Sequence, residues 1–255
     1  MKVVFFGTPS FVDPVLKALQ TNFDVVSIIR DPKQFNNSTI QQLKGLNPDL
    51  FIVASFGKIL SKEVLSIPKL GALNIHPSLL PKYRGPSPIQ TTIINGDKKT
   101  GVTIIKMDEE VDHGPIIFQK EDEIRDSDTF ETLAERLFKI GAENLPGTIS
   151  NYVLNKINIT PQDDSSATLT KLLNRESGLI DVYNPPDKVT LDHMIRAYFP
   201  WPGVWAKYNL GDNKKIIKFL PNEKLQVEGK KPMSYKDFIN GYPNSKEILN
   251  KLNLI

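Results

Sequence analysis

The sequence contains no cysteine, only three histidines, and no apolar run long enough to span a membrane. The lack of cysteine excludes disulfide bonds and thiolate metal sites, so the fold must be stabilised by packing. The first residues, MKVVFFGTPSF, enter a predicted strand without a cleavable signal pattern. We therefore expect a cytoplasmic protein with no membrane partner and no bound metal.

The net charge is also small, because 32 Lys or Arg nearly balance 29 Asp or Glu and leave +3 over the 255 residues. Residues 165–255 hold 14 Lys or Arg against 9 Asp or Glu, whereas the preceding residues hold 18 against 20. A basic C-terminal part suits contact with a polyanion such as RNA, although lysines that serve solubility alone give the same count. Charge by itself leaves both interpretations open.

Short apolar runs alternate with helical patterns over the first part of the chain. Strands are predicted at Lys2–Gly7, Asp24–Ile29, Asp49–Ala54 and Gly71–Ile75, with helices at Pro14–Gln20 and Ile40–Leu46. This alternation indicates right-handed crossovers and an α/β fold with a doubly wound, mostly parallel sheet. Ligands of such sheets lie beyond the carboxyl ends of the strands.

The pattern changes in the second half of the chain. Thr100–Met107 and Pro115–Lys120 read as an antiparallel pair of strands, and Asp128 with Glu131 predicts a capping box for the helix that follows. Residues 156–168 are polar and lack periodicity, so they predict a linker between domains at residues 1–155 and 169–255. The C-terminal part has hairpin signals, notably a Gly-Asp-Asn turn, and predicts a small β-barrel or sandwich.

Three polar residues lie where the ligand rule places a site. Asn74 and His76 end the fourth strand and, being two residues apart, point to the same side. Asp112 lies in the connection between the later strands. Acyl transfer to an amine needs a hydrogen-bond donor for the tetrahedral oxyanion, a side chain that takes up and releases a proton, and a charged group that orients that side chain. The amide of Asn74, the imidazole of His76 and the carboxylate of Asp112 can supply these three functions.

Each of these residues alone is more often structural, since a strand-end histidine is usually satisfied locally and a turn aspartate usually caps backbone amides. Their combination favours a catalytic interpretation. His113 is equally compatible with lining the site and with a structural role, whereas His193 lies in a helical pattern and is interpreted as structural.

The surroundings of these residues resemble the folate-dependent formyltransferases. The resemblance is carried by the loop Ser78–Gly85, by Thr100–Ile116, and by the motifs FGTPSF, GPSPIQ, FPWPG and LQVEGKKPMSYKDFINGY. It implies a Rossmann-like catalytic domain followed by an OB-like β-barrel that helps to hold transfer RNA. It further implies a monomer that transfers the formyl group of 10-formyltetrahydrofolate to the α-amino group of initiator methionyl-tRNA, by direct attack through a tetrahedral intermediate.

The resemblance also implies roles for individual residues. Catalysis is assigned to Asn74, His76 and Asp112. Folate binding is assigned to Phe56, Gly57, Ile59, Ser78, Leu79, Leu80, Pro81, Met107 and Asp108. Contacts with the acceptor are assigned to Phe6, Thr8, Pro9, Phe11, Arg84 and Gly85.

The chain departs from the family pattern in two places. The segment between Ile29 and Ile40 is short and poor in charge where the family has a longer basic segment, and His113 replaces a threonine. The first departure keeps a second hypothesis open, formylation of an amino sugar nucleotide or another small amine. A non-catalytic RNA-binding relative is the third hypothesis, and the intact set of Asn74, His76 and Asp112 argues against it.

The motif FGTPSF lacks the three-glycine dinucleotide fingerprint, so a nicotinamide enzyme is disfavoured.

Overall fold

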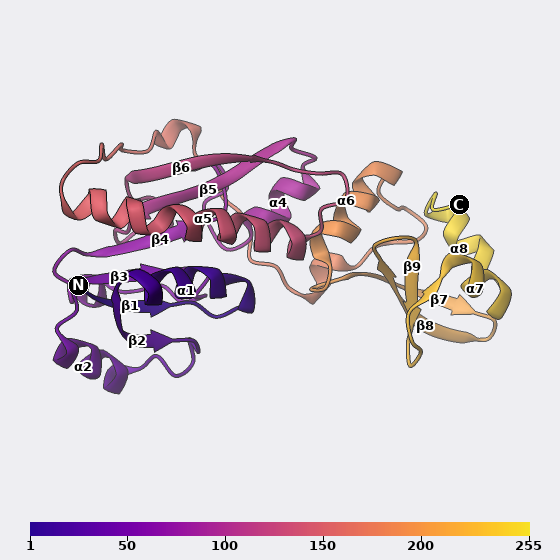
Figure 1. The fold of residues 1–255 in the computed structure, drawn as a ribbon. Coiled ribbons are helices and arrows are strands. Elements are labelled where there is room, and N and C mark those ends of the chain that lie inside the picture. Colours follow the sequence, from indigo (N-terminus) through magenta and orange to yellow (C-terminus); the bar gives the residue numbers. More distant parts are fainter. The chain divides into compact units, whose positions relative to one another are not determined.

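The computed structural model describes residues 1–255 and divides the chain into two compact units (Figure 1). The first unit contains residues 1–88, 98–124 and 133–171. The second contains residues 89–97, 125–132 and 172–255. The predicted linker, residues 156–168, therefore lies within the first unit.

The first unit is built on a six-stranded sheet with the order β2-β1-β3-β4-β5-β6. Its strands are β1 (Lys2–Phe6), β2 (Asp24–Ile29), β3 (Leu50–Val53), β4 (Ala72–His76), β5 (Lys99–Lys106) and β6 (Ile116–Glu123). Strands β1 to β4 pair in parallel, and β5 and β6 continue the sheet in antiparallel pairing. The predicted α/β fold with a mostly parallel sheet is confirmed, as is the antiparallel pair.

Helices cover both faces of this sheet, as its apolar strands require. Helices α1 (Asp13–Asn22) and α5 (Phe130–Val153) lie on one face (Figure 1), where the rings of Phe11 and Phe138 stack at 5.3 Å between centroids. Helices α2 (Asn37–Leu46) and α3 (Lys62–Leu65) contribute to a core cluster with residues of β1 and β3. Helix α4 (Pro88–Ile94) precedes β5 in the chain, and its residues from Ile89 onward belong to the second unit.

The start of α5 differs from the sequence prediction. Thr129 and Thr132 exchange side-chain-to-backbone hydrogen bonds of 3.0 and 3.4 Å immediately before and inside the first turn. This reciprocal pair is a capping box displaced by one residue from the predicted Asp128 and Glu131. A threonine hydroxyl both accepts and donates, so Thr132 can complete the box in place of the carboxylate of Glu131.

Four phenylalanines form the centre of this core cluster. The ring of Phe6 lies 5.6, 5.0 and 5.3 Å from the rings of Phe35, Phe51 and Phe56, in edge-to-face geometry each time. Such pairs stabilise a core beyond the burial of their surface. The cluster fixes the ends of β1 and β3 and the loops that follow them.

The second unit contains a four-stranded antiparallel sheet in the order β10-β9-β8-β7. Its elements are α6 (Lys188–Tyr198), β7 (Val204–Leu210), β8 (Asn213–Leu220), β9 (Lys224–Val227), β10 (Met233–Ser234), α7 (Tyr235–Gly241) and α8 (Ser245–Lys251). The predicted hairpin is present as β7 and β8, which turn at Gly211 with φ 63°. Helices α7 and α8 were not predicted.

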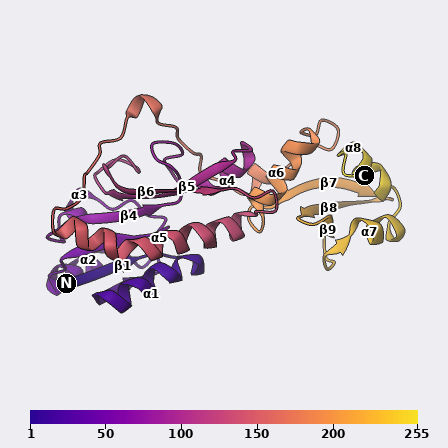
Figure 2. The same ribbon diagram turned by 45° about the horizontal axis from the view of Figure 1, so that its top comes forward.

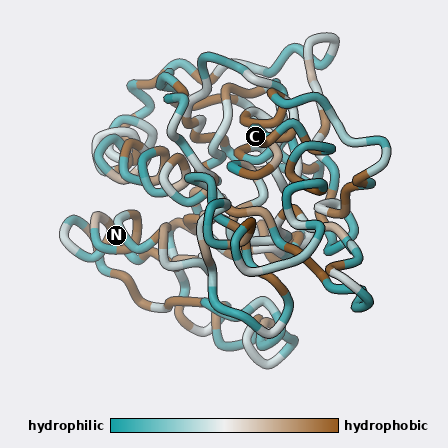
Figure 3. Tube along the Cα trace, turned by 90° about the vertical axis from the view of Figure 1, so that its right-hand side faces the viewer, coloured by the Kyte–Doolittle hydropathy of each residue, from teal (hydrophilic) through white to brown (hydrophobic).

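Hydrophobic and hydrophilic stretches alternate along the whole chain trace (Figure 3). The core is made of buried aliphatic and aromatic side chains from strands of both sheets, such as Phe5, Ile52, Ile217 and Phe219. No helix combines the length and the apolar character needed to cross a bilayer.

Candidate active site

The candidate site begins at the carboxyl end of β4, in the first unit. Val53 is the parallel partner of Asn74, so the side chain of Asn74 continues the face that carries Phe51, Val53 and Ala72. His76 lies two residues further on and points to that same face, as the alternation of the strand predicts. Strand geometry thus places the carboxamide and the imidazole side by side.

Asp112 meets both groups from the connection between β5 and β6. Asn74 Nδ2 donates to Asp112 Oδ1 at 2.9 Å, and the backbone amide of Gly85 donates to Asp112 Oδ2 at 2.8 Å. His76 Nδ1 lies 3.4 Å from Asp112 Oδ2. The structure therefore brings together the three residues that the sequence singled out for catalysis, although 36 residues separate His76 from Asp112 in the chain.

Both ring nitrogens of His76 face acceptor oxygens. His76 Nε2 lies 2.9 Å from the carbonyl oxygen of Tyr83. A carbonyl oxygen accepts but never donates, so Nε2 carries a hydrogen and donates it. The side chain of His76 is only 5% exposed, and its other ring nitrogen, Nδ1, faces the Asp112 carboxylate. Tyr83 is a contributor that sequence reasoning missed.

Asp112 is held in an unusual backbone conformation, with φ 51°. A non-glycine residue in this region costs of order 1–3 kcal/mol and persists where its surroundings enforce it. Here the amide of Gln162 donates to the carbonyl oxygens of both Asp112 and Gly114, each at 2.8 Å. Gln162 lies inside the predicted linker and was not a candidate from sequence.

Residues 160–171 are named the strap. They contact two loops of the site, the loop Ser78–Gly85 and the connection between β5 and β6 that carries Asp112. The chain can be followed through the strap after α5 in Figure 2. Thr160 forms an antiparallel bridge with Ile116, at the start of β6. Leu169 forms a parallel bridge with Arg84, where Arg84 N donates to Thr168 O at 2.8 Å and Thr170 N donates to Arg84 O at 2.8 Å. The strap is thus part of the site's framework.

Residues 8–149 of the chain match the family described as formyl transferase, which is more than half of its length. The chain belongs to the formyl transferase family. A relative from Methylacidiphilum infernorum named methionyl-tRNA formyltransferase is 38% identical over 252 residues, which cover 86% of this chain and 78% of that protein. This agreement makes the chain a formyltransferase, as the sequence predicted.

Solved structures of formyltransferases share the fold. The methionyl-tRNA formyltransferase from Clostridium thermocellum superposes with a TM-score of 0.71 at 22% identity, covering 92% of this chain and 99% of that one. An N-formyltransferase from Helicobacter canadensis, solved with folinic acid and dTDP-3-aminofucose, gives a TM-score of 0.65 at 21% identity, covering 92% and 98%. At these identities the similarity establishes the fold and leaves the acceptor to other arguments.

The residues predicted to contact the acceptor occupy different environments in this formyltransferase. Phe6 is fully buried in the aromatic cluster, and Phe11 stacks on Phe138, so neither ring is free to meet a ligand in this structure. Thr8 is exposed, and its hydroxyl donates to Phe56 O at 3.2 Å. Pro9 is partly exposed.

Arg84 and Gly85, also predicted to contact the acceptor, have partners inside the protein. The guanidinium of Arg84 is 8% exposed, with Nε donating to Gln162 Oε1 at 2.9 Å and Nη2 to Asp164 Oδ1 at 2.7 Å. The amide of Gly85 donates to Asp112. Both residues therefore hold the site together in this structure.

The predicted folate residues divide by exposure. Ile59 is 73% exposed and Gly57 is open to solvent with φ 73°, so both present surface to a ligand. Phe56 and Leu80 are buried, and Met107 packs against the aromatic cluster. Ser78 is buried too, and its hydroxyl donates to Lys82 O at 2.7 Å, which shapes the turn. Leu79, Pro81 and Asp108 are partly exposed.

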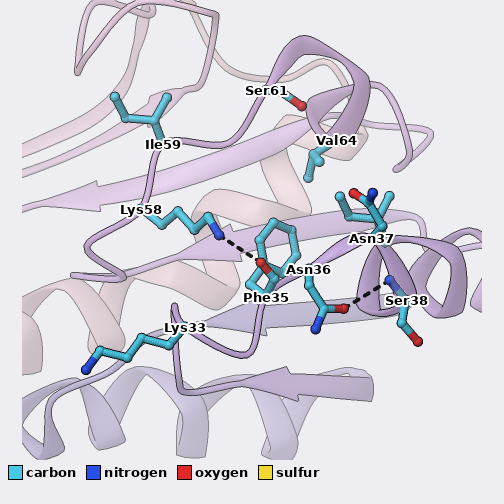
Figure 4. Close-up of a pocket in the computed structure, with 10 residues that line it drawn as sticks. Lys33, Phe35, Asn36, Asn37, Ser38, Lys58, Ile59, Ser61 and Val64 are labelled. Atoms are coloured by element: carbon cyan, nitrogen blue, oxygen red, sulfur yellow. Dashed lines mark hydrogen bonds between the residues drawn. The ribbon is translucent and has the colours of Figure 1, made fainter.

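An open pocket of about 790 Å³ lies next to this region (Figure 4). It is lined by Lys33, Phe35, Asn36, Asn37, Ser38, Ile40, Lys58, Ile59, Ser61 and Val64. Lys58 Nζ donates to Phe35 O at 2.8 Å, a hydrogen bond between two residues of the lining. Ile59 is the one predicted folate residue in its lining, and none of the catalytic three belongs to it.

His113 interacts with acidic residues on both sides. Its Nδ1 lies 2.6 Å from Asp108 Oδ2, and its Nε2 lies 3.5 Å from Asp164 Oδ2 in the strap. The hydrogen bond to Asp108 is the main cause that raises the pKa of His113 above its ordinary value, with smaller contributions from the charges of Asp108, Glu110 and Asp164. Protonated His113 thus joins the loop to the strap.

The raised pKa of His113 predicts a pH-dependent stability. A group whose pKa is higher in the folded state stabilises the fold fully below its unfolded value, and this stabilisation is lost as pH rises through the folded pKa. We expect the melting temperature of the wild type to exceed that of His113→Thr by a larger margin at about pH 5.5 than at about pH 9. Thermal melts of both proteins at the two pH values measure this margin, and an equal margin at both would contradict the assignment.

Proposed function

We propose that this formyltransferase moves the formyl group of 10-formyltetrahydrofolate to the α-amino group of initiator methionyl-tRNA, a step of translation initiation. The observation that carries the proposal is the 38% identity, over 86% of the chain, to a protein named methionyl-tRNA formyltransferase. The clustering of Asn74, His76 and Asp112 supports it, because this set meets the needs of amine acylation.

The chemistry requires one bond to form and one to break. The neutral amine attacks the formyl carbon, giving a tetrahedral intermediate with a negatively charged oxygen. Collapse of the intermediate then breaks the bond between the formyl carbon and N10 of the folate. The proton that the amine loses is delivered to N10 in the same overall process, so charge and protons balance.

The site residues take distinct parts in this scheme. The amide nitrogen of Asn74 has two hydrogens, one of which binds Asp112, so the other is available for the developing oxyanion. His76 Nδ1 takes the proton from the amine and returns it to the departing nitrogen, while the Asp112 carboxylate stabilises the charged imidazole. Nε2 stays bound to Tyr83 O throughout and keeps the ring in place.

A basic face of the second unit supports transfer RNA as the partner. The strand register places Lys207 of β7, Lys214 and Lys218 of β8 and Lys224 of β9 on one face of the antiparallel sheet, and all four are exposed. Such a face matches the regularly spaced phosphates of a nucleic acid. We propose that this face contributes to tRNA binding, that Ile59 and Gly57 contact the folate, and that the enzyme acts as a monomer.

Mass spectrometry of methionyl-tRNA after incubation with the protein and 10-formyltetrahydrofolate tests the proposal. The expected result is a mass gain of one formyl group on the methionyl moiety, in proportion to enzyme added. An amino sugar nucleotide offered in parallel is expected to react far more slowly. Preferential formylation of the sugar would overturn the proposed acceptor, and RNA binding with no transfer to any amine would overturn the proposed chemistry.

A further inference from the structure

We infer that Gln162 is a positioning residue for catalysis, which orients the Asp112 carboxylate through the backbone of its loop. The inference rests on the proposed formyl transfer at Asn74, His76 and Asp112. It concerns a residue outside the three catalytic groups, in a stretch that the sequence suggested was a linker.

Both the nitrogen and the oxygen of the Gln162 side-chain amide form hydrogen bonds. Its nitrogen donates to the carbonyl oxygens of Asp112 and Gly114 at 2.8 Å each, and its oxygen accepts from Arg84 Nε at 2.9 Å. An amide has two donor hydrogens, so both are used. This side chain therefore links the loop that carries Asp112 to the loop that carries Arg84 and Gly85.

The two carbonyls lie on either side of His113, and together they fix the peptide planes that follow Asp112. Asp112 has φ 51°, a conformation that the neighbouring structure must enforce. The carboxylate can reach Asn74 Nδ2 and Gly85 N simultaneously only from a defined backbone position. Gln162 restrains that position through the backbone carbonyl oxygens of Asp112 and Gly114, which are separate from the carboxylate and its partners.

The rest of the strap keeps Gln162 in register with both loops. The bridge between Thr160 and Ile116 fixes the strap two residues before Gln162, and the bridge between Leu169 and Arg84 fixes it seven residues after. Asp164 adds an ion pair with Arg84 at 2.7 Å. These contacts anchor the strap independently of the Gln162 amide, so the backbone of the strap has other means of staying in place when that amide is replaced.

Two substitutions separate positioning of Asp112 from simple anchoring. Gln162→Glu keeps an oxygen for Arg84 but has no hydrogens to donate to the two carbonyls, whereas Gln162→Leu loses both kinds of contact at similar size. Positioning predicts that both variants lower kcat, by roughly 10- to 100-fold, as a small misplacement of a reacting group does. Simple anchoring through Arg84 predicts that the glutamate variant retains activity. Ser165→Ala is the matched control, because the Ser165 hydroxyl bonds Asp163 within the strap and contacts neither loop.

Steady-state kinetics with 10-formyltetrahydrofolate and methionyl-tRNA, together with thermal melts, measure these effects. We expect both Gln162 variants to lose kcat while KM for the folate stays within about twofold and the fold stays intact, and Ser165→Ala to behave as wild type. A Gln162→Glu variant with wild-type kcat would overturn the inference, as would a loss confined to KM. Wild-type protein that transfers no formyl group would instead refute the proposed function, so the two failures are distinguishable.

Discussion

His76→Ala is expected to lower kcat by roughly 100- to 10,000-fold, the range found when an acid-base group is removed. In the proposed scheme the imidazole is the one group of the three that serves both as general base and as general acid. Its Nδ1 faces Asp112 at 3.4 Å while Nε2 is bound to Tyr83 O. Removing the ring leaves the attacking amine without a proton acceptor at this position.

Alanine also removes a buried side chain, so a second substitution is needed to separate chemistry from packing. His76→Gln keeps an amide hydrogen that can donate to Tyr83 O but offers no group that exchanges protons. We expect it to match the alanine variant in kcat and the wild type in melting temperature, with folate binding largely retained in both variants. Near-normal turnover of either variant would show that His76 has been misassigned.

Asp112→Asn is expected to lower kcat by roughly 100- to 1,000-fold, although the new side chain has nearly the same shape. Asp112 accepts from two donors at once, Asn74 Nδ2 on one oxygen and Gly85 N on the other. Asparagine has one acceptor oxygen, so its amino group must face one of those donors. Either Asn74 or the loop at Gly85 then loses its partner, and the charge that stabilises protonated His76 disappears.

The control for this substitution is Glu110→Gln, which removes an exposed carboxylate from the same loop. Turnover of methionyl-tRNA at saturating folate, measured for both variants beside the wild type, gives the comparison. We expect Glu110→Gln to keep kcat within about twofold, because a solvent-exposed charge interacts only weakly with the groups of the site. Equal activity of Asp112→Asn and the wild type would mean that the carboxylate charge is dispensable.

Much of the first unit could be predicted from local pattern alone. The apolar runs of β1 to β4 and their alternation with helices determine a mostly parallel sheet, because continuous burial on both faces requires helical crossovers. The pairing of Asn74 with His76 followed from the same logic, since strand alternation is a local property. The family resemblance predicted that Asp112 lies near Asn74 and His76. The connection between the antiparallel strands β5 and β6 brings it there.

What the sequence determined by itself is therefore the order of strands and helices in the first unit and the choice of Asn74, His76 and Asp112 as candidate catalytic groups. The elements follow from local periodicity, and the candidates follow from residue chemistry and the family resemblance. Tertiary structure alone decided that Tyr83 selects the donor nitrogen of His76, that Arg84 and Gly85 bind the protein's own groups, and that a polar stretch becomes the strap. The reason is physical: backbone amides and carbonyls are present at every residue, and a polar side chain can find its partner anywhere in the chain, so neither leaves a specific trace in the sequence. Their role appears only once folding brings distant segments within hydrogen-bonding distance.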